Sequence, residues 1–289
     1  ITALVAEMER ARQHGFTQSE IDRAKAELLR GMENDYAERD KELNGKYVRQ
    51  CLGNFTDGEP MLSAGQELQL VKRLDKSVTL ADVNRMVREM ISDRNQVVTL
   101  YGPEKDGFKL PSNEEVEQAI LTAQSQTYEA PKEEKVPTKL MPVLPRKGKI
   151  VSEKEVSNGY REFTLSNGMR VYARQTDFKA DNISMYLFSP GGKNVYPDSD
   201  MPSMQYLASV INSSGVAGFS ESTLEKMLAG KQLSVSPYLS DETEGMRGSS
   251  SVKDFETMLQ LTYLYFTSPR RDDEVFQSMM NRQASFLTN

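Results

Sequence analysis

The chain has very little of the two side chains on which most metal and nucleophile chemistry in proteins depends. Its 289 residues include one histidine, His14, and one cysteine, Cys51. Zinc sites, Ser/His and Cys/His nucleophile pairs and disulfide frameworks draw on these side chains, usually in combination. We therefore expect no site of these kinds to be completed within the chain. A single cysteine also leaves the redox compartment undecided.

The sequence also has no long apolar run and no basic stripe. A membrane-spanning helix needs roughly 20 consecutive apolar residues, and no run approaches that length. No secretory signal is visible at the start. Lysine and arginine (36) are interspersed with aspartate and glutamate (42), which gives a net charge of −6. These patterns predict no membrane span and no nucleic-acid partner.

The apolar content of the chain suits two domains. Apolar residues make up 38% of the sequence, which is enough for one large core or two of ordinary size, and we favour two. The chain begins at Ile1 inside a helical pattern and stops at Asn289 just after another. We expect both ends to be cuts through a longer protein.

Residues 1–126 are predicted to be almost wholly helical. At Thr17, a threonine followed three residues later by a glutamate forms a capping box, in which each side chain satisfies a backbone amide at the helix start. The same pattern recurs at Ser63 and Ser112, and apolar residues at helical spacing follow each start. The helix upstream of Thr17 ends at His14, before a glycine. A pair of antiparallel helices joined by a short turn is expected there.

One strand is predicted to close this helical segment. Residues 96–101 carry β-branched and aromatic side chains and stop at Gly102-Pro103, which is typical of a strand. A lone strand is unstable, so its pairing partners are expected elsewhere in the fold, most simply upstream of the chain.

Residues 127–157 are predicted to be a linker. Four prolines, at positions 131, 137, 142 and 145, fall among many lysines and glutamates and few aromatic residues. Such chains stay extended at about 3 Å per residue, so the segment is long enough to cross the surface of a neighbouring part.

Residues 158–289 show strands first and helices after. Residues 161–165 and 169–173 alternate around Asn167-Gly168, a dipeptide that favours a tight hairpin turn. Further strands are predicted over 183–189, 232–239 and 244–252, and helices over 202–212, 222–229, 255–266 and 275–286. This order predicts an α+β fold with helices on one face of an antiparallel sheet.

Three short motifs look like functional sites, and local structure explains each of them better. Residues 218–222 approach a nucleophile elbow, but serine replaces the second glycine and this part of the chain has no histidine, so helix capping is favoured. Residues 229–232 lack the upstream glycine and the hydroxyl of a phosphate loop and are expected to end a helix. Residues 190–192 are expected to form a turn.

The lone histidine and cysteine also have structural explanations. His14 is expected at a helix end, where a partly cationic imidazole interacts favourably with the carbonyl end of the helix dipole. Cys51 lies near Val48 and Leu52 and is expected to be a small buried residue. A paired-carboxylate acid/base site stays open, although neither spacing nor an apolar setting marks a candidate pair.

The order of elements in the second part resembles a known family. The resemblance rests on residues 163–171, on the strand that ends in Ser189-Pro190-Gly191-Gly192, and on the helix that ends near Gly215. Together they look like the opening of a domain of the M16 family, the pitrilysin/insulinase zinc metallopeptidases. The LuxS/MPP-like fold of that family is α+β, as the pattern of elements predicts.

The resemblance implies where a zinc site would lie. Catalytic domains of the family place His-x-x-Glu-His on this helix, and the corresponding stretch here runs from Tyr206 to Val210. Tyr206 and Val210 take the places of two zinc ligands and Ser209 that of the general base. Gln283 is the nearest polar residue to the place of the third ligand, a glutamate. Without imidazoles and carboxylate, zinc cannot be held or its water activated, so we expect no catalytic and no metal-binding residue.

The first part resembles the family as well, in the second half of its repeat. His14–Lys25 is similar to a helix-turn-helix of that half, and residues 97–103 to its closing strand. The resemblance therefore implies that residues 1–126 are the C-terminal half of one repeat. Residues 127–157 would then link it to residues 158–289, the N-terminal part of the next repeat.

The function that this resemblance implies is that of a non-catalytic middle section of an M16-like zinc metalloendopeptidase. The section would help to enclose a peptide substrate, with the remaining repeats as partners and zinc only in the parent protein. A non-catalytic scaffold subunit of the same family, such as a core subunit of the bc1 complex, is the first alternative. An unrelated α+β binding module is the second, and in that case the strand at Val97 would pair with the second sheet. The bacterial periplasm or envelope is the compartment that the resemblance suggests.

Overall fold

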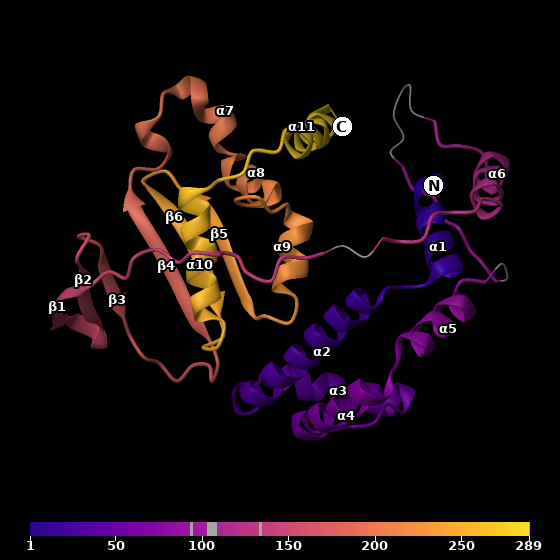
Figure 1. The fold of residues 1–289 in the computed structure, drawn as a ribbon, viewed down its shortest axis with the longest axis horizontal. Helices are drawn as coiled ribbons and strands as arrows, with labels where there is room; N and C mark the ends of the chain where they lie inside the picture. Colours follow the sequence, from indigo (N-terminus) through magenta and orange to yellow (C-terminus); the bar gives the residue numbers. More distant parts are fainter. Residues whose placement is uncertain (93–94, 103–108, 133–134, 289) are drawn as a thin grey trace.

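The computed structural model describes residues 1–92, 95–102, 109–132 and 135–288. Helices fill the first part of the chain, and two small antiparallel sheets with helices fill the second (Figure 1). The α+β fold class predicted from the sequence is confirmed. Within the described ranges, no helix combines the length and the apolar character that crossing a membrane requires.

The helices of the first part do not pack in the order in which they follow one another. They are α1 (Thr2–His14), α2 (Gln18–Glu38), α3 (Asn44–Asp57), α4 (Ala64–Ser77), α5 (Leu80–Met90) and α6 (Asn113–Gln124). The main neighbours of α1 are α6 and α5, whereas α2 packs against α4. Asn84 of α5 bonds both backbone groups of Phe16 and holds the turn, and α2 runs away from α1 beyond it (Figure 1). The expected antiparallel pair of α1 and α2 was therefore wrong.

Each predicted capping box is formed. The side chains of Thr17, Ser63 and Ser112 accept a hydrogen bond from the backbone amide three residues on, and the third residue's side chain accepts one in return. Thr79 and Asp82 form a fourth box at the start of α5. The two residues of each box are three positions apart, so hydrogen bonds within one helical turn are sufficient to form it.

Replacing Asp82 with asparagine is expected to remove a pH-dependent contribution to stability. Hydrogen bonds from the Thr79 side chain and backbone amide lower the pKa of the Asp82 carboxyl below its ordinary value of 3.8. Because the pKa is lower in the folded state, the Asp82 carboxylate contributes its full stabilisation at pH values above its ordinary pKa of 3.8. That stabilisation is lost as the pH falls through the lowered pKa.

Urea unfolding followed between about pH 2 and pH 6, a range that brackets ordinary carboxyl pKa values, measures this effect. The stability difference between wild type and D82N should shrink toward the acid end. Glu117→Gln, which removes an exposed carboxylate from α6, is the control. A D82N difference that stays constant with pH would contradict the assignment.

The predicted strand over residues 96–101 is not formed. These residues have no regular secondary structure, and Val97 and Tyr101 are 87% and 89% exposed. A strand requires a partner with which to share its backbone hydrogen bonds, and no described residue pairs with this segment. Pro103, which was expected to end the strand, lies outside the described residues.

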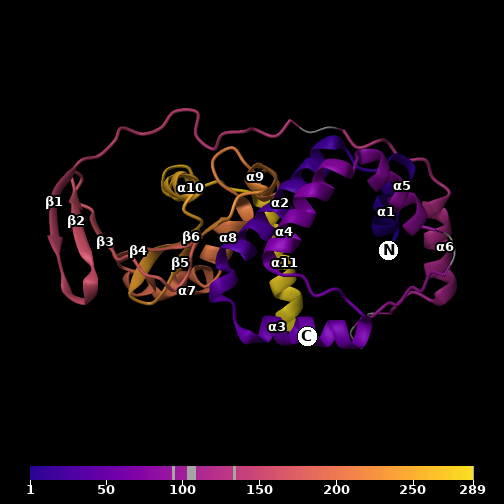
Figure 2. The ribbon, with the colours of Figure 1, turned by 90° about the horizontal axis from the view of Figure 1, so that it is seen from below.

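The predicted linker is irregular over most of its described length, but not to its expected end at residue 157. Residues 150–155 form β1 (Ile150–Glu155) instead. The irregular part crosses from α1 past α10 (Figures 1 and 2). The Tyr128 amide donates to the side-chain oxygen of Gln13, and Leu140 is buried, 7% exposed, in the core of the second part. The segment therefore contributes to packing as well as joining two parts.

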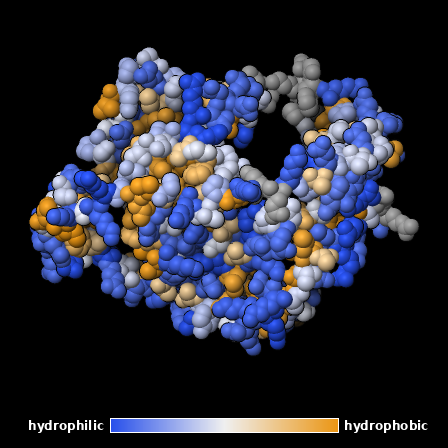
Figure 3. Space-filling view, in the orientation of Figure 1, coloured by the Kyte–Doolittle hydropathy of each residue, from blue (hydrophilic) through white to orange (hydrophobic). Residues whose placement is uncertain are grey.

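The predicted hairpin is confirmed. β2 (Arg161–Leu165) pairs antiparallel with β3 (Arg170–Ala173), and Gly168 takes a φ of +86° in the turn between them. β1 adds a third strand on the other side of β2. This small sheet stands apart from the rest of the second part, and hydrophobic residues gather on its surface at the left of Figure 3. Val151 and Tyr172 are 64% and 48% exposed.

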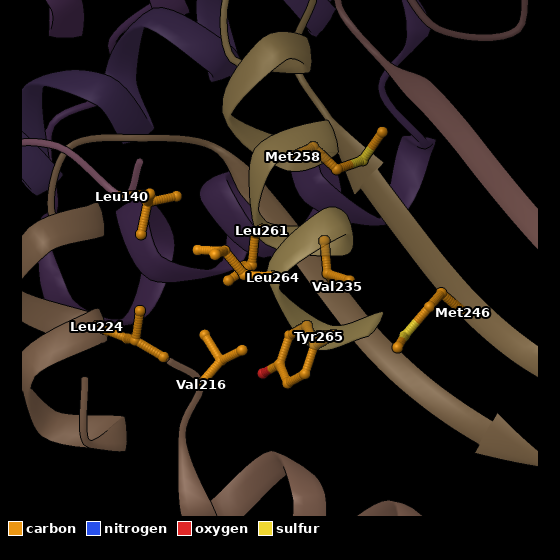
Figure 4. Packing of buried hydrophobic residues seen from close by; sticks show 9 residues of the cluster. All are labelled: Leu140, Val216, Leu224, Val235, Met246, Met258, Leu261, Leu264 and Tyr265. Carbon is orange, nitrogen blue, oxygen red and sulfur yellow. The ribbon is translucent and has the colours of Figure 1, made fainter. Parts of the chain in front are cut away.

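The second sheet has the strand order β4-β6-β5, with both pairs antiparallel. Its strands are β4 (Ile183–Pro190), β5 (Leu233–Leu239) and β6 (Thr243–Ser250). The helices of this part are α7 (Met201–Met204), α8 (Leu207–Ser214), α9 (Glu221–Leu228), α10 (Phe255–Thr267) and α11 (Asp273–Thr288). α10 crosses one face of the sheet over β5 and β6, and the core lies beneath it (Figures 1 and 4). The core residues are Leu140, Val216, Leu224, Val235, Met246, Met258, Leu261, Leu264 and Tyr265.

The two parts of the chain meet through polar contacts at α2. The Glu38 carboxylate accepts hydrogen bonds from the backbone amides of Ala180 and Asp181, at 2.9 and 3.0 Å. Arg30 reaches the other part as well, with Nη2 3.2 Å from Asp181 Oδ2 and 3.8 Å from Asp254 Oδ2. Buried ionic contacts of this kind depend on every partner, because an isolated buried charge is costly.

Candidate functional site

The stretch from Tyr206 to Val210 lies where one helix was expected and two are found. Gln205 and Tyr206 interrupt the predicted helix over 202–212, so that α7 ends before them and α8 begins after them. The Val210 amide donates to the Tyr206 carbonyl at 2.9 Å, which places these two residues one helical turn apart. Tyr206 precedes the first residue of α8 as its N-cap, and Val210 lies in the first turn of that helix.

The side chains at these positions do not fit zinc. Zinc in proteins is bound by imidazole, thiolate or carboxylate groups. Val210 offers no donor atom, Tyr206 offers a phenol, and Ser209 offers an exposed hydroxyl. α11, which carries Gln283, packs beside α8, and Gln283 offers a neutral amide and no carboxylate.

The described residues contain no cluster of three or more histidine, cysteine, aspartate or glutamate side chains that could hold a metal ion. His14 is at the end of α1, as predicted, and its Nε2 lies 2.6 Å from the carbonyl oxygen of Tyr128. Cys51 is exposed, so its predicted burial was wrong. The face of α3 that carries Cys51, Val48 and Leu52 is largely open to solvent, because no described helix or strand packs extensively against α3.

The three short motifs have the structural roles predicted for them. Ser220 caps α9, and its Oγ accepts a hydrogen bond from the Thr223 amide at 3.2 Å. Ala229 ends the same helix. Gly192 lies in a turn with a φ of +76°, directly against the backbone of Ser240.

A cavity of about 720 Å³ lies between α2, α9, β5 and α10. Its apolar wall includes Leu224, Leu228 and Tyr265, and three carboxylates, Glu27, Glu221 and Glu225, line it as well. Sequence reasoning missed this cavity because Glu27 is distant in sequence from the other two. The spacing of Glu221 and Glu225, one turn apart on a helix, was the available signal.

Three curated proteins with zinc-protease names are similar to this chain. They are a "Zinc protease PQQL-like" of Arabidopsis thaliana (28% identical, covering 90% of this chain) and the "Probable zinc protease PqqL" of Haemophilus influenzae (24%, 93%) and of Escherichia coli (23%, 99%). The chain covers 25%, 29% and 31% of their lengths, so it spans between a quarter and a third of each relative. No family model matches the chain.

Two solved structures share the fold. The periplasmic protease PqqL of Escherichia coli is 21% identical with a TM-score of 0.50, covering 99% of this chain and 32% of that one. A point mutant of the ferredoxin protease FusC, in complex with Arabidopsis ferredoxin, is 18% identical with a TM-score of 0.52, covering 96% and 31%.

The chain is thus related to zinc proteases. The resemblance to the M16 zinc metallopeptidases, predicted from the hairpin and the helix before Gly215, is confirmed by the names of these relatives and the shared fold.

Proposed function

We propose that the chain is a non-catalytic middle section of an M16-like zinc metalloendopeptidase that helps to enclose a peptide substrate. Residues 1–126 would be the C-terminal half of one repeat and residues 158–289 the N-terminal part of the next. The observation that carries the proposal is the stretch Tyr206–Val210, which the resemblance aligns with the zinc motif and which has none of its ligands. Zinc would be held elsewhere in the parent protein.

Exposed apolar surface supports this role as one section of a larger assembly. Phe55 and Leu43 on and beside α3 are 88% and 80% exposed, and Ile150 and Val151 of β1 are 59% and 64% exposed. Large exposed apolar patches mark surfaces that another part of a protein covers. We propose that the remaining repeats of the parent protein cover these faces.

The alternatives receive less support. An unrelated binding module required residues 96–101 to pair with the second sheet, and they do not. A scaffold subunit of the same family is consistent with the absence of ligands from Tyr206–Val210, but the relatives carry the names of proteases. We propose the bacterial periplasm or envelope as compartment because one structural neighbour is a periplasmic protease.

The purified chain is expected to bind less than one equivalent of zinc and to leave unstructured peptides intact. The physical reason is that no imidazole or carboxylate occupies the positions where the family's ligands lie. Inductively coupled plasma mass spectrometry after dialysis measures the metal, and mass spectrometry of a peptide mixture measures cleavage. One equivalent of zinc per chain together with hydrolysis that a chelator stops would contradict the proposal.

A further inference from the structure

The two faces of the second sheet differ in what covers them. Val235 and Met246 lie in the core beneath α10 (Figure 4). Because side chains alternate between the faces of a sheet, the residues one position away point to the opposite face, which we call the outer face. Tyr186 and Phe188 there are 54% and 59% exposed, and Arg247 is exposed as well. The large side chains of the outer face are Tyr186, Phe188, Tyr238 and Arg247, and its other positions hold small uncharged residues.

The aromatic side chains of the outer face form one patch across β6. Tyr186 of β4 and Tyr238 of β5 are stacked, with ring centroids 5.1 Å apart and an interplanar angle of 16°. Tyr238 pairs in register with Gly245 of β6, and the missing side chain of this glycine leaves room for the two rings to meet above the strand. The Phe188 ring lies 5.6 Å from that of Tyr186. Three rings therefore form a continuous apolar surface.

Arg247 carries the one charge of the outer face. Its guanidinium carbon lies 4.8 Å from the centroid of the Tyr238 ring and 5.6 Å from that of the Tyr186 ring. Stacking on two rings orients the guanidinium plane and leaves N–H groups along its edge able to bind an anion. No carboxylate among the described residues forms an ion pair with Arg247. The charge of this face is therefore uncompensated and positive.

The outer face has the composition of a protein interface. The centres of such interfaces are rich in tyrosine, phenylalanine and arginine and poor in lysine, aspartate and glutamate. The outward positions of the three strands include none of the last three residue types. Small ligands bind in concave pockets, whereas these side chains lie on an open sheet surface. The kind of partner that fits is thus a polypeptide.

We propose that the outer face binds a segment of the enclosed polypeptide substrate that carries a glutamate or aspartate beside an apolar residue. The carboxylate would accept two parallel hydrogen bonds from the Arg247 guanidinium, and the apolar residue would cover Tyr186 and Phe188. A second copy of the chain fits less well, because a two-fold contact between outer faces would bring two Arg247 side chains together without a carboxylate. That the segment belongs to a substrate rests on the proposed function, whereas the preference for a carboxylate rests on the outer face alone.

Fluorescence anisotropy with the intact protein tests the proposal. The probe is a short labelled peptide of glycine, leucine and glutamate, and its counterpart has glutamine in place of glutamate. A chelator is present throughout, so that no metal-dependent hydrolysis consumes either peptide. We expect the glutamate peptide to bind more tightly, and the variant R247Q to weaken its binding by at least roughly tenfold, which corresponds to about 1.4 kcal/mol. The same variant should leave binding of the glutamine peptide nearly unchanged.

Two further variants sharpen the test. Arg271→Gln removes a guanidinium that is 87% exposed and lies outside the outer face, so it should leave binding of both peptides unchanged. Arg247→Lys keeps the charge but loses the planar fork that stacks on the rings and pairs with a carboxylate. It should bind the glutamate peptide more weakly than wild type and more tightly than R247Q. Circular dichroism verifies that each variant keeps its fold.

The proposal is overturned if wild type binds the two peptides equally well, or if R247Q still prefers the glutamate peptide. It is also overturned if neither peptide binds the intact protein. In that case a molecular mass that doubles with concentration in light scattering would point to a second copy on the outer face, and a constant mass to another section of the parent protein. None of these outcomes changes the zinc measurement, so the proposed function and this site can fail separately.

Discussion

Asp254→Ala is expected to lower the free energy of unfolding by about 3–5 kcal/mol, the cost typical of breaking a buried charged contact. The Asp254 side chain is 4% exposed and accepts hydrogen bonds from the Gln232 amide at 2.9 Å and the Ser251 hydroxyl at 2.8 Å. Arg30 and Lys231 lie within 4.0 Å of the same carboxylate. Alanine would leave the Gln232 amide and the Ser251 hydroxyl without this acceptor. It would also remove one of the carboxylates that balance the charge of Arg30, at the junction of α2 with the second sheet.

Urea unfolding followed by far-ultraviolet circular dichroism measures this effect, because the chain contains no tryptophan to report by fluorescence. Asp273→Ala is the matched control. Its side chain is 74% exposed and forms a surface ion pair with Arg271, so its loss should cost no more than about 1 kcal/mol. An Asp254→Ala protein as stable as the Asp273→Ala protein would show that the carboxylate does not hold the two parts together.

Gly215→Ala is expected to destabilise the fold by about 3 kcal/mol, or to prevent folding. Gly215 ends α8 with a φ of +79°, a conformation that costs other residues of order 1–3 kcal/mol. An added Cβ would also lie 2.2 Å from the Phe219 carbonyl oxygen, which is backbone and cannot rotate away. The next residue, Val216, is fully buried in the core, so the turn cannot shift without moving packed side chains.

Gly218→Ala supplies the control from the same turn. Gly218 does not have a positive φ, and no heavy atom lies within 4 Å of the place where its Cβ would be. We expect the thermal midpoint of the Gly218→Ala variant to stay within a few degrees of that of wild type, since a surface substitution of this size changes stability by about 0.5 kcal/mol or less. Equal thermal midpoints for Gly215→Ala and Gly218→Ala would show that position 215 does not require glycine.

The features predicted correctly are those whose determinants lie within a few residues. The capping boxes at Thr17, Ser63 and Ser112 form, the Asn167-Gly168 turn joins β2 to β3, and Ser220 caps α9. Hydrogen bonds between residues three or four apart, and a glycine able to take positive φ, decide these features. The sequence therefore predicted most of the elements themselves.

The wrong predictions depended on distant partners. Residues 96–101 have the composition of a strand but no strand beside them, and residues 150–155 have the composition of a linker but pair with β2. Cys51 is exposed because no described helix or strand packs extensively against α3. Leu140 is buried because α9 and α10 lie next to the path of the linker, which no local pattern announces.

The sequence by itself determined what this chain lacks. With one histidine in the chain, and with Tyr206, Ser209 and Val210 in the stretch that the resemblance aligns with the zinc motif, the sequence supplies no imidazole or carboxylate there, and folding cannot supply donor atoms that the residues lack. Tertiary structure decided what the chain brings together. Glu27 lines the same cavity as Glu221 and Glu225, although about 200 residues separate them in the chain, because α2 contacts the segment that precedes β5, where Asn34 accepts a hydrogen bond from Gln232.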